Sequence, residues 1–230
     1  MARLPRLALA GRPHYLVQRG HNGAPVFLDA ADRAAYLAIL REAAATHRVA
    51  IHAYALGDTE IRLLATPDEA PALSQWMQAV GRRYVAGFNR RHGRSGTLWS
   101  GRFRSTVVED GQVMDCVRHI EAPSGGAEQD GGAAEAGASS APHHAGVRTD
   151  PTIKEHAAYW RLGNTPFDRE AAYRRLQETP LPERVARAIA DAVEQGWPLG
   201  SAEFKGELSK HTARRLHPLS KGRPRKPTME

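Results

Sequence analysis

The fold follows from residues 49–66, VAIHAYALGDTEIRLLAT, which contain two β-rich runs separated by a turn. In residues 49–56 the side chains alternate between two faces. One face carries Ile51, Ala53 and Ala55, and the other carries His52, Tyr54 and Leu56. Gly57 and Asp58 are typical of a turn, and residues 60–66 form the returning strand. This stretch predicts a β-hairpin, or two neighbouring strands of one sheet.

The elements around this stretch predict a β-α-β-β-α-β-α order. They are strands over 14–19 and 98–108 and helices over 31–46, 73–91 and 112–121. Asp29 or Asp32 is placed to cap the first helix. The second helix has apolar side chains at three- and four-residue steps: Leu73, Trp76, Met77, Val80, Tyr84 and Phe88. The order is close to a ferredoxin-like α+β fold, an antiparallel sheet with helices on one face.

The chain beyond residue 122 changes in composition. Thirteen of the 28 residues from 123 to 150 are Gly or Ala, which predicts a flexible linker with His143 and His144 exposed to solvent. Helices are predicted over 167–177, 182–195 and 201–215, as a packed appendage or a helix-turn-helix-like DNA contact. The chain then divides into a ferredoxin-like domain (1–122), the linker (123–150), a helical region (151–216) and a basic tail (217–230).

The net charge indicates a polyanionic partner. Lys and Arg number 32 against 25 Asp and Glu, giving +7, and this balance favours nucleic acid. Charged residues at 25% and hydrophobic residues at 41% exclude full disorder, a collagen-like fibre and a disulfide scaffold. Arg223 and Arg225 lie in KGRPRK, residues 221–226, which resembles an AT-hook that enters an A·T minor groove. A generic basic tail is the alternative.

Few features indicate a compartment. Cys116 is the only cysteine, so it forms no internal disulfide and fits a reducing environment. The apolar run at residues 7–10 is too short for a signal peptide, and no window approaches the roughly 20 apolar residues of a membrane span. We therefore expect a cytoplasmic protein without membrane contact.

Three stretches carry a family resemblance: HYLVQRGHNGAPVF (14–27), HAYALGDTEIRLLATP (52–67) and MQAVGRRYVAGFNRRHGRSGTLWSGRFRS (77–105). Together they resemble the single-strand-DNA tyrosine transposases of the HUH group, especially those associated with repetitive extragenic palindromes (REP). The order of helix, FNRR, GTLW and GRF in the third stretch is the most specific feature. The segments at 160–176 and 196–204 also resemble longer members of that family.

The resemblance implies a ferredoxin-like fold and a defined chemistry. In the family, two histidines flanking an apolar residue on a central strand hold a divalent cation, Mg²⁺ or Mn²⁺. A tyrosine on a following helix attacks a DNA phosphate and forms a phosphotyrosyl link. Here the histidine positions match Glu60 and Arg62, and the tyrosine positions match Val117 and His119. Because Arg62 cannot ligate a metal, we expect no bound cation, no functional catalytic residue and no strand cleavage.

Two other functions remain open. One is an active transposase that cuts and rejoins single-stranded hairpin DNA with Glu60, Asp58 and His119 as substitutes. The other is a protein-interaction module. His52 is expected to be a half-buried strand histidine rather than a replacement ligand.

An arginine-rich stretch predicts where nucleic acid binds. Seven arginines fall within 23 residues: Arg82, Arg83, Arg90, Arg91, Arg94, Arg102 and Arg104. Alternation is expected to send Arg102 and Arg104 to one face of a strand. Guanidinium groups suit bidentate phosphate contacts, so we expect contact with the backbone of single-stranded hairpin or palindromic DNA. Trp99 and Phe103 either stack on bases or pack in the core. A homodimer is an alternative assembly.

Overall fold

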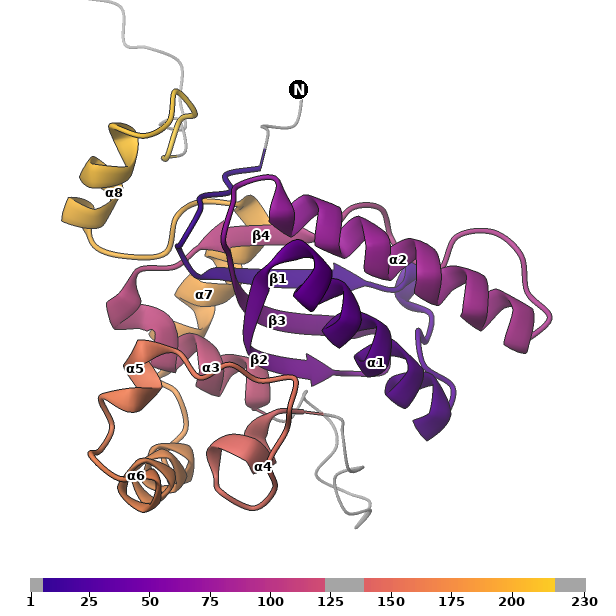
Figure 1. The fold of residues 1–230 in the computed structure, drawn as a ribbon. Helices are drawn as coiled ribbons and strands as arrows, with labels where there is room; N and C mark the ends of the chain where they lie inside the picture. Colours follow the sequence, from indigo (N-terminus) through magenta and orange to yellow (C-terminus); the bar gives the residue numbers. More distant parts are fainter. Residues whose placement is uncertain (1–5, 123–138, 218–230) are drawn as a thin grey trace, which may run out of the picture.

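The computed structural model describes residues 6–122 and 139–217, and it confirms an α+β fold (Figure 1). Four antiparallel strands form one sheet in the order β2-β3-β1-β4. The strands are β1 His14–Arg19, β2 Val49–Leu56, β3 Glu60–Pro67 and β4 Arg104–Val107. None of the helices in the described residues is both long and apolar enough to cross a membrane.

Eight α-helices are present in the described residues. They are α1 Ala30–His47, α2 Ala72–Arg91, α3 Val113–Glu121, α4 Ala141–His144, α5 Ala157–Trp160, α6 Pro166–Glu178, α7 Glu183–Gln195 and α8 Ala202–Ser209. Short 3-10 turns lie at His21–Gly23 and Asp110–Gln112. Asp29 caps α1 by accepting from the Asp32 N–H, and Thr165 and Asp168 form a capping box on α6.

The helices α1 and α2 pack side by side on one face of the sheet, as the ferredoxin-like order predicts (Figure 1). The stripe that predicted α2 is the face it buries, with Trp76 and Tyr84 at its centre. Both polar atoms of these side chains are satisfied. The Trp76 indole donates to the Leu40 carbonyl at 3.1 Å, and the Tyr84 hydroxyl donates to the Val26 carbonyl at 2.7 Å.

The opposite face of the sheet is also covered by helices, so the expectation of helices on one face was incomplete. Tyr15, Val17 and Leu64 bury their side chains there. They pack against α3, α5, α6 and α7 in a single apolar cluster. Because the two central strands are apolar on both faces, each face needs a helical layer. Residues 157–193 therefore supply core to the same sheet as the N-terminal domain.

One assignment of strand faces and two sequence-based boundaries were wrong. A β-bulge between Ile51 and Ala53 breaks the alternation of β2, so Ile51 shares a face with Tyr54 and Leu56. The strand expected over 98–108 is continuous only from Arg104 to Val107, with isolated β-bridges at Trp99 and Val108, because Gly101 turns the chain at φ 85°. The helix expected over 201–215 ends at Ser209.

The expected linker is ordered from residue 139 onward; residues 123–138 lie outside the described residues. The Ser140 N–H donates to the Tyr54 carbonyl at 3.0 Å, which ties this segment to the edge strand β2. His144 is 1% exposed and His143 is half-buried, so the prediction that both are solvent-exposed was wrong.

A buried carboxylate explains this order. Glu121 ends α3, and its side chain is fully buried. It accepts hydrogen bonds from the Ser140 hydroxyl, the Tyr173 hydroxyl and, at 2.8 Å, His144 Nδ1. Burying a carboxylate without such donors costs free energy. The hydrogen bonds to Glu121 therefore hold α4 and α6 against α3. We call these four residues the Glu121 cluster.

Replacing Glu121 by Ala should destabilise the protein by about 3–5 kcal/mol, because three buried donors lose their acceptor. Tyr173→Phe should cost less, about 1.5–3 kcal/mol, because it removes one hydrogen bond to a charged group. Urea unfolding measures both. Glu183→Ala is the matched control, because Glu183 is an exposed residue of α7, and it should change the free energy of unfolding little. Equal effects of all three variants would contradict a structural role for the cluster.

His14 makes stability depend on pH. Its Nδ1 donates to the Arg12 carbonyl at 2.7 Å and its Nε2 accepts from the Leu9 N–H at 3.2 Å, which requires the neutral ring. Burial lowers the pKa of His14 from 6.5 to about 4, although the Arg12 carbonyl opposes this. The folded pKa lies below the unfolded one. The stabilisation is therefore present above about pH 6.5 and is lost as pH falls towards 4.

We expect the free energy of unfolding to fall by about 3 kcal/mol for His14 alone between about pH 7 and pH 4. Urea unfolding over this range measures it, and His52, whose burial also lowers its pKa to about 4, adds in the same direction. His14→Gln should flatten the pH dependence, whereas exposed His211→Gln should not. If His14→Gln does not fold, an NMR titration of His14 that ends near 6.5 contradicts the prediction.

Candidate functional site

The residues that the resemblance places at catalytic positions lie close together, on the sheet face that α3 covers. In the β1–β3 register Glu60 lies opposite Arg19, and Arg62 lies opposite Val17. Arg62 donates to the His119 carbonyl at 3.2 Å. Glu60, Arg62 and His119 therefore form one site, while Val117 packs into the apolar cluster beneath it.

Arginines engage both oxygens of the Glu60 carboxylate. Arg62 Nε lies 2.7 Å from Oε1, and Arg19 Nε lies 3.1 Å from Oε2. Burial alone would raise the pKa of Glu60, but the hydrogen bonds and charges of Arg62 and Arg19 outweigh it and lower the pKa. Glu60 is thus a structural anion held between two guanidinium groups.

The ion pairs continue from Glu60 to α7. Arg19 Nη1 lies 2.9 Å from Glu194 Oε2, and Arg104 Nη2 lies 3.0 Å from Glu194 Oε1. Arg104 also donates to the Glu194 carbonyl at 2.6 Å. We call Arg62, Glu60, Arg19, Glu194 and Arg104 the Glu60 network. Sequence reasoning missed Arg19 and Glu194, because the pairing joins residues 175 positions apart.

The donor set of this site does not fit a divalent cation. Arg62 is cationic and cannot ligate a metal, and Glu60 is shared by two arginines. Asp58, a candidate substitute, instead forms an ion pair with Arg33 of α1. Across residues 6–122 and 139–217, no three His, Cys, Asp or Glu side chains are grouped so as to hold a metal ion.

Two side chains near the site, Tyr15 and His119, carry nucleophilic atoms, but these atoms are hydrogen-bonded to each other. The Tyr15 hydroxyl lies 2.9 Å from His119 Nδ1, and Tyr15 is 1% exposed. Burial raises the pKa of Tyr15 far above its ordinary value. Burial and then the charge of Arg62 lower the pKa of His119, although Glu60 opposes this. Tyr15 and His119 therefore satisfy each other inside the protein.

The arginine stretch divides into two groups. Arg83 is paired with Glu42, Arg91 with Asp29 and Asp32, and Arg104 with Glu194. In the described residues, four others are exposed and have no carboxylate partner: Arg82, Arg90, Arg94 and Arg102. We call these four the arginine surface. Arg223 and Arg225 lie outside the described residues.

The structure corrects the expectation for Arg102, and it bears out the core position of Trp99 and Phe103 and the strand position of His52. Arg102 precedes β4, so it does not alternate with Arg104 along a strand. Trp99 and Phe103 are buried in the α1–α2 core, and they are not available to stack on bases. His52 is buried as a strand histidine, with Nδ1 2.6 Å from the Lys154 carbonyl and Nε2 2.8 Å from the Thr66 hydroxyl.

Comparisons with known proteins give a resemblance in structure. No protein-family model matches the chain, and no curated protein matches it in sequence. A REP-associated tyrosine transposase bound to a REP hairpin is similar at a TM-score of 0.45 and 12% identity, over 52% of this chain and 70% of that one. A proposed transposase from Deinococcus radiodurans R1 is similar at a TM-score of 0.36 and 20% identity, over 53% and 93%. The chain resembles these transposases over about half its length.

Replacing Arg62 by Met should raise the pKa of His119. The substitution keeps an aliphatic side chain but removes a cation beside the ring, and Glu60 then favours the protonated form. A proton NMR titration of the His119 ring measures the change. Arg187→Met on α7 is the matched control, because Arg187 pairs with Glu183 and forms no ion pair with the Glu60 network. An unchanged or lower pKa in Arg62→Met would show that Arg62 does not act on His119.

Proposed function

We propose that this chain is a relative of the REP-associated tyrosine transposases that binds DNA without cutting it. The observation that carries the proposal is the contrast between two sets of arginines. The Glu60 network uses its arginines to neutralise carboxylates where the family places metal ligands. The guanidinium groups of the arginine surface are exposed and have no carboxylate partner among residues 6–122 and 139–217.

The unpaired arginines suit a phosphate backbone. Arg82 and Arg90 lie on exposed faces of α2, and Arg94 and Arg102 lie in the loop that joins α2 to β4. Arg94 also stacks against Phe88, with its guanidinium carbon 5.4 Å from the ring centroid. Contacts of this kind position DNA but read no sequence. The family motifs in residues 77–105 make single-stranded hairpin or palindromic DNA the proposed ligand.

The absence of cleavage is proposed on chemical grounds. In-line attack on a phosphate needs an accessible nucleophile and positive charge aimed at the reacting oxygens. Tyr15 is buried against His119, and the charge of Arg62 is directed at Glu60. Neither group is arranged to meet a phosphodiester.

The proposal predicts how binding depends on salt. A fluorescence-anisotropy titration with a REP-like DNA hairpin should show affinity that falls as salt rises. Replacing Arg82, Arg90, Arg94 and Arg102 together by Ala should lower the slope of log K against log salt by about 3, because each lost phosphate contact contributes about 0.7–0.9. Arg48→Ala/Arg187→Ala is the matched control, since both side chains are exposed but paired with carboxylates. If the slope of log K against log salt is unchanged in the fourfold variant, the DNA binds at another surface.

The same samples test cleavage. Incubation with Mg²⁺ or Mn²⁺ followed by a denaturing gel should show an intact strand and no covalent protein–DNA band. A covalent band would support an active transposase instead, and variants of Glu60, Asp58 and His119 would then identify its nucleophile. If this protein binds another protein but binds no DNA hairpin at low salt, the result would favour a protein-interaction module.

A further inference from the structure

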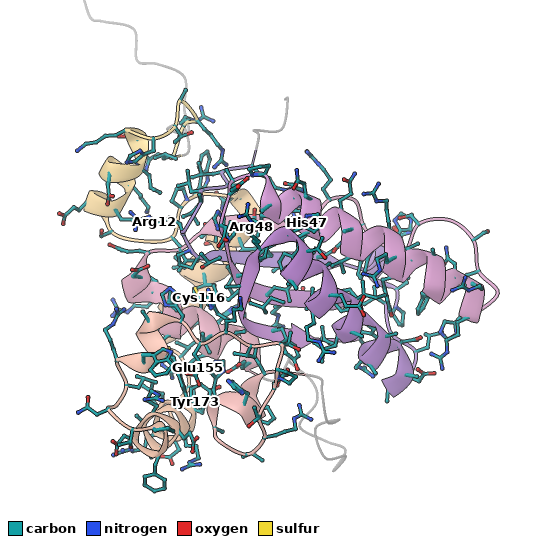
Figure 2. The ribbon with its side chains drawn as sticks, viewed as in Figure 1. Arg12, His47, Arg48, Cys116, Glu155 and Tyr173 are labelled. Atoms are coloured by element: carbon teal, nitrogen blue, oxygen red, sulfur yellow. The ribbon has the colours of Figure 1, made fainter. Side chains whose placement is uncertain are left out.

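A hollow of about 360 Å³ lies between α6 and the segment that joins α4 to α5. Two cations, Arg148 and Arg169, and two carboxylates, Glu155 and Glu170, are among the residues that line it. Figure 1 shows α4, α5 and α6 together on the side of the sheet away from α2, and Glu155 is labelled in Figure 2. The hollow is therefore separate from the arginine surface, and the proposed function does not use it.

Arg169 lines this hollow as a buried cation without a counter-ion. It is only 6% exposed, and it forms no salt bridge with any described residue. Its Nη1 donates to the Gly163 carbonyl over a long 3.4 Å, and its buried Nε has no hydrogen-bond partner in the described part of the chain. A buried guanidinium group with an unsatisfied donor costs free energy, so an acceptor that enters the hollow would stabilise it.

His143 contributes a second unsatisfied donor to the same hollow. Its Nδ1 accepts a hydrogen bond from the Asp150 N–H at 3.1 Å, which places the proton of the neutral ring on Nε2. The Nε2 atom is buried and has no hydrogen-bond partner among residues 6–122 and 139–217. The Glu155 Oε1 atom lies 3.7 Å away, which is beyond hydrogen-bond distance. Two buried N–H groups that line one hollow therefore lack acceptors.

The two carboxylates of the hollow also lack close partners. Glu170 is half-buried and forms neither a hydrogen bond nor a salt bridge with the described residues. Its carboxylate packs on Gly146, where a Cβ atom would collide with it. Glu155 is half-buried too, and its one ion pair in the described chain is the 3.7 Å contact with His143. Opposite charges thus surround a shared space without meeting each other.

We propose that this hollow binds a free α-amino acid. Arg169 and the His143 Nε2–H bind its carboxylate, and Glu155 and Glu170 bind its ammonium group. A simple anion would be repelled by the two carboxylates and a simple cation by the two arginines, so a small molecule with both charges fits best. The volume lies at the lower end of the range for small-molecule sites, about 300–1,000 Å³. This inference is independent of the proposed DNA binding.

Isothermal titration calorimetry of the full-length protein with each common L-amino acid in turn tests the proposal. We expect at least one amino acid to bind. Its N-acetyl derivative, which lacks the ammonium group, and its amide, which lacks the carboxylate, should each bind about tenfold more weakly or worse. That factor is the loss expected when one hydrogen-bonded charge is removed from the ligand.

Variants of the hollow provide a second test. Glu155→Gln/Glu170→Gln keeps the shape of both side chains, and Arg169→Met keeps an aliphatic side chain of similar length. Each should weaken binding of the amino acid by about tenfold or more. Glu178→Gln and Arg175→Met are the matched controls, because both residues are exposed on α6 and do not line the hollow. If Arg169→Met does not fold, the Glu155→Gln/Glu170→Gln variant decides.

Three results would overturn the proposal. One is that no amino acid binds, and another is that Glu155→Gln/Glu170→Gln binds as tightly as the wild type. The third is equal affinity for an amino acid and its N-acetyl derivative, since the ammonium group would then play no part. Titration of the same variants with a DNA hairpin tests the proposed function separately, because they leave the arginine surface unchanged. Loss of amino-acid binding with hairpin binding intact is the expected pattern.

Discussion

The structure depends on a central pair of strands that is apolar on both faces. In β1, Leu16 packs towards α1 and α2, while Tyr15 and Val17 pack towards α3 and α7. A four-stranded sheet with two buried faces cannot be completed by the two helices of a ferredoxin-like unit alone. The region after residue 139 supplies the second layer, and Glu121 fastens it there through Ser140, His144 and Tyr173. What looks in composition like an appendage is therefore part of the core.

That second layer also determines which partners the side chains of Glu60 and Arg62 meet. By bringing Glu194 of α7 within 3.0 Å of both Arg19 and Arg104, it extends the ion pairing of Glu60 into a five-residue network. Exposed ion pairs individually contribute little to stability, often under about 1 kcal/mol. The network matters for the chemistry of the site, because Arg62 and Arg19 form ion pairs with carboxylates. Next to it, His119 is hydrogen-bonded to the buried Tyr15.

Much of this fold could be predicted from local patterns. The bounds of β2, the stripe on α2 and the Asp29 cap come from short-range signals, and each lies where the sequence indicates. The bulge at Ile51 was not predictable, because it depends on how β2 meets β3. The order of residues 139–150 was missed because Gly and Ala content predicts flexibility but carries no information about one buried carboxylate. Glu60, Arg62 and His119 were found through the family motifs, whereas Glu194 required the tertiary fold.

The division of the arginines follows from the same constraint. Arg104 lies beside the second helical layer and meets Glu194, so its charge is satisfied within the chain. On α2, Arg83 and Arg91 likewise reach Glu42, Asp29 and Asp32, whereas Arg82 and Arg90 face solvent. Because helices cover this face of the sheet, a phosphate has no access to it. A polyanion then gains most binding free energy at the exposed arginines around the sheet. In the proposed function, the DNA hairpin contacts the arginine surface, which is part of that periphery.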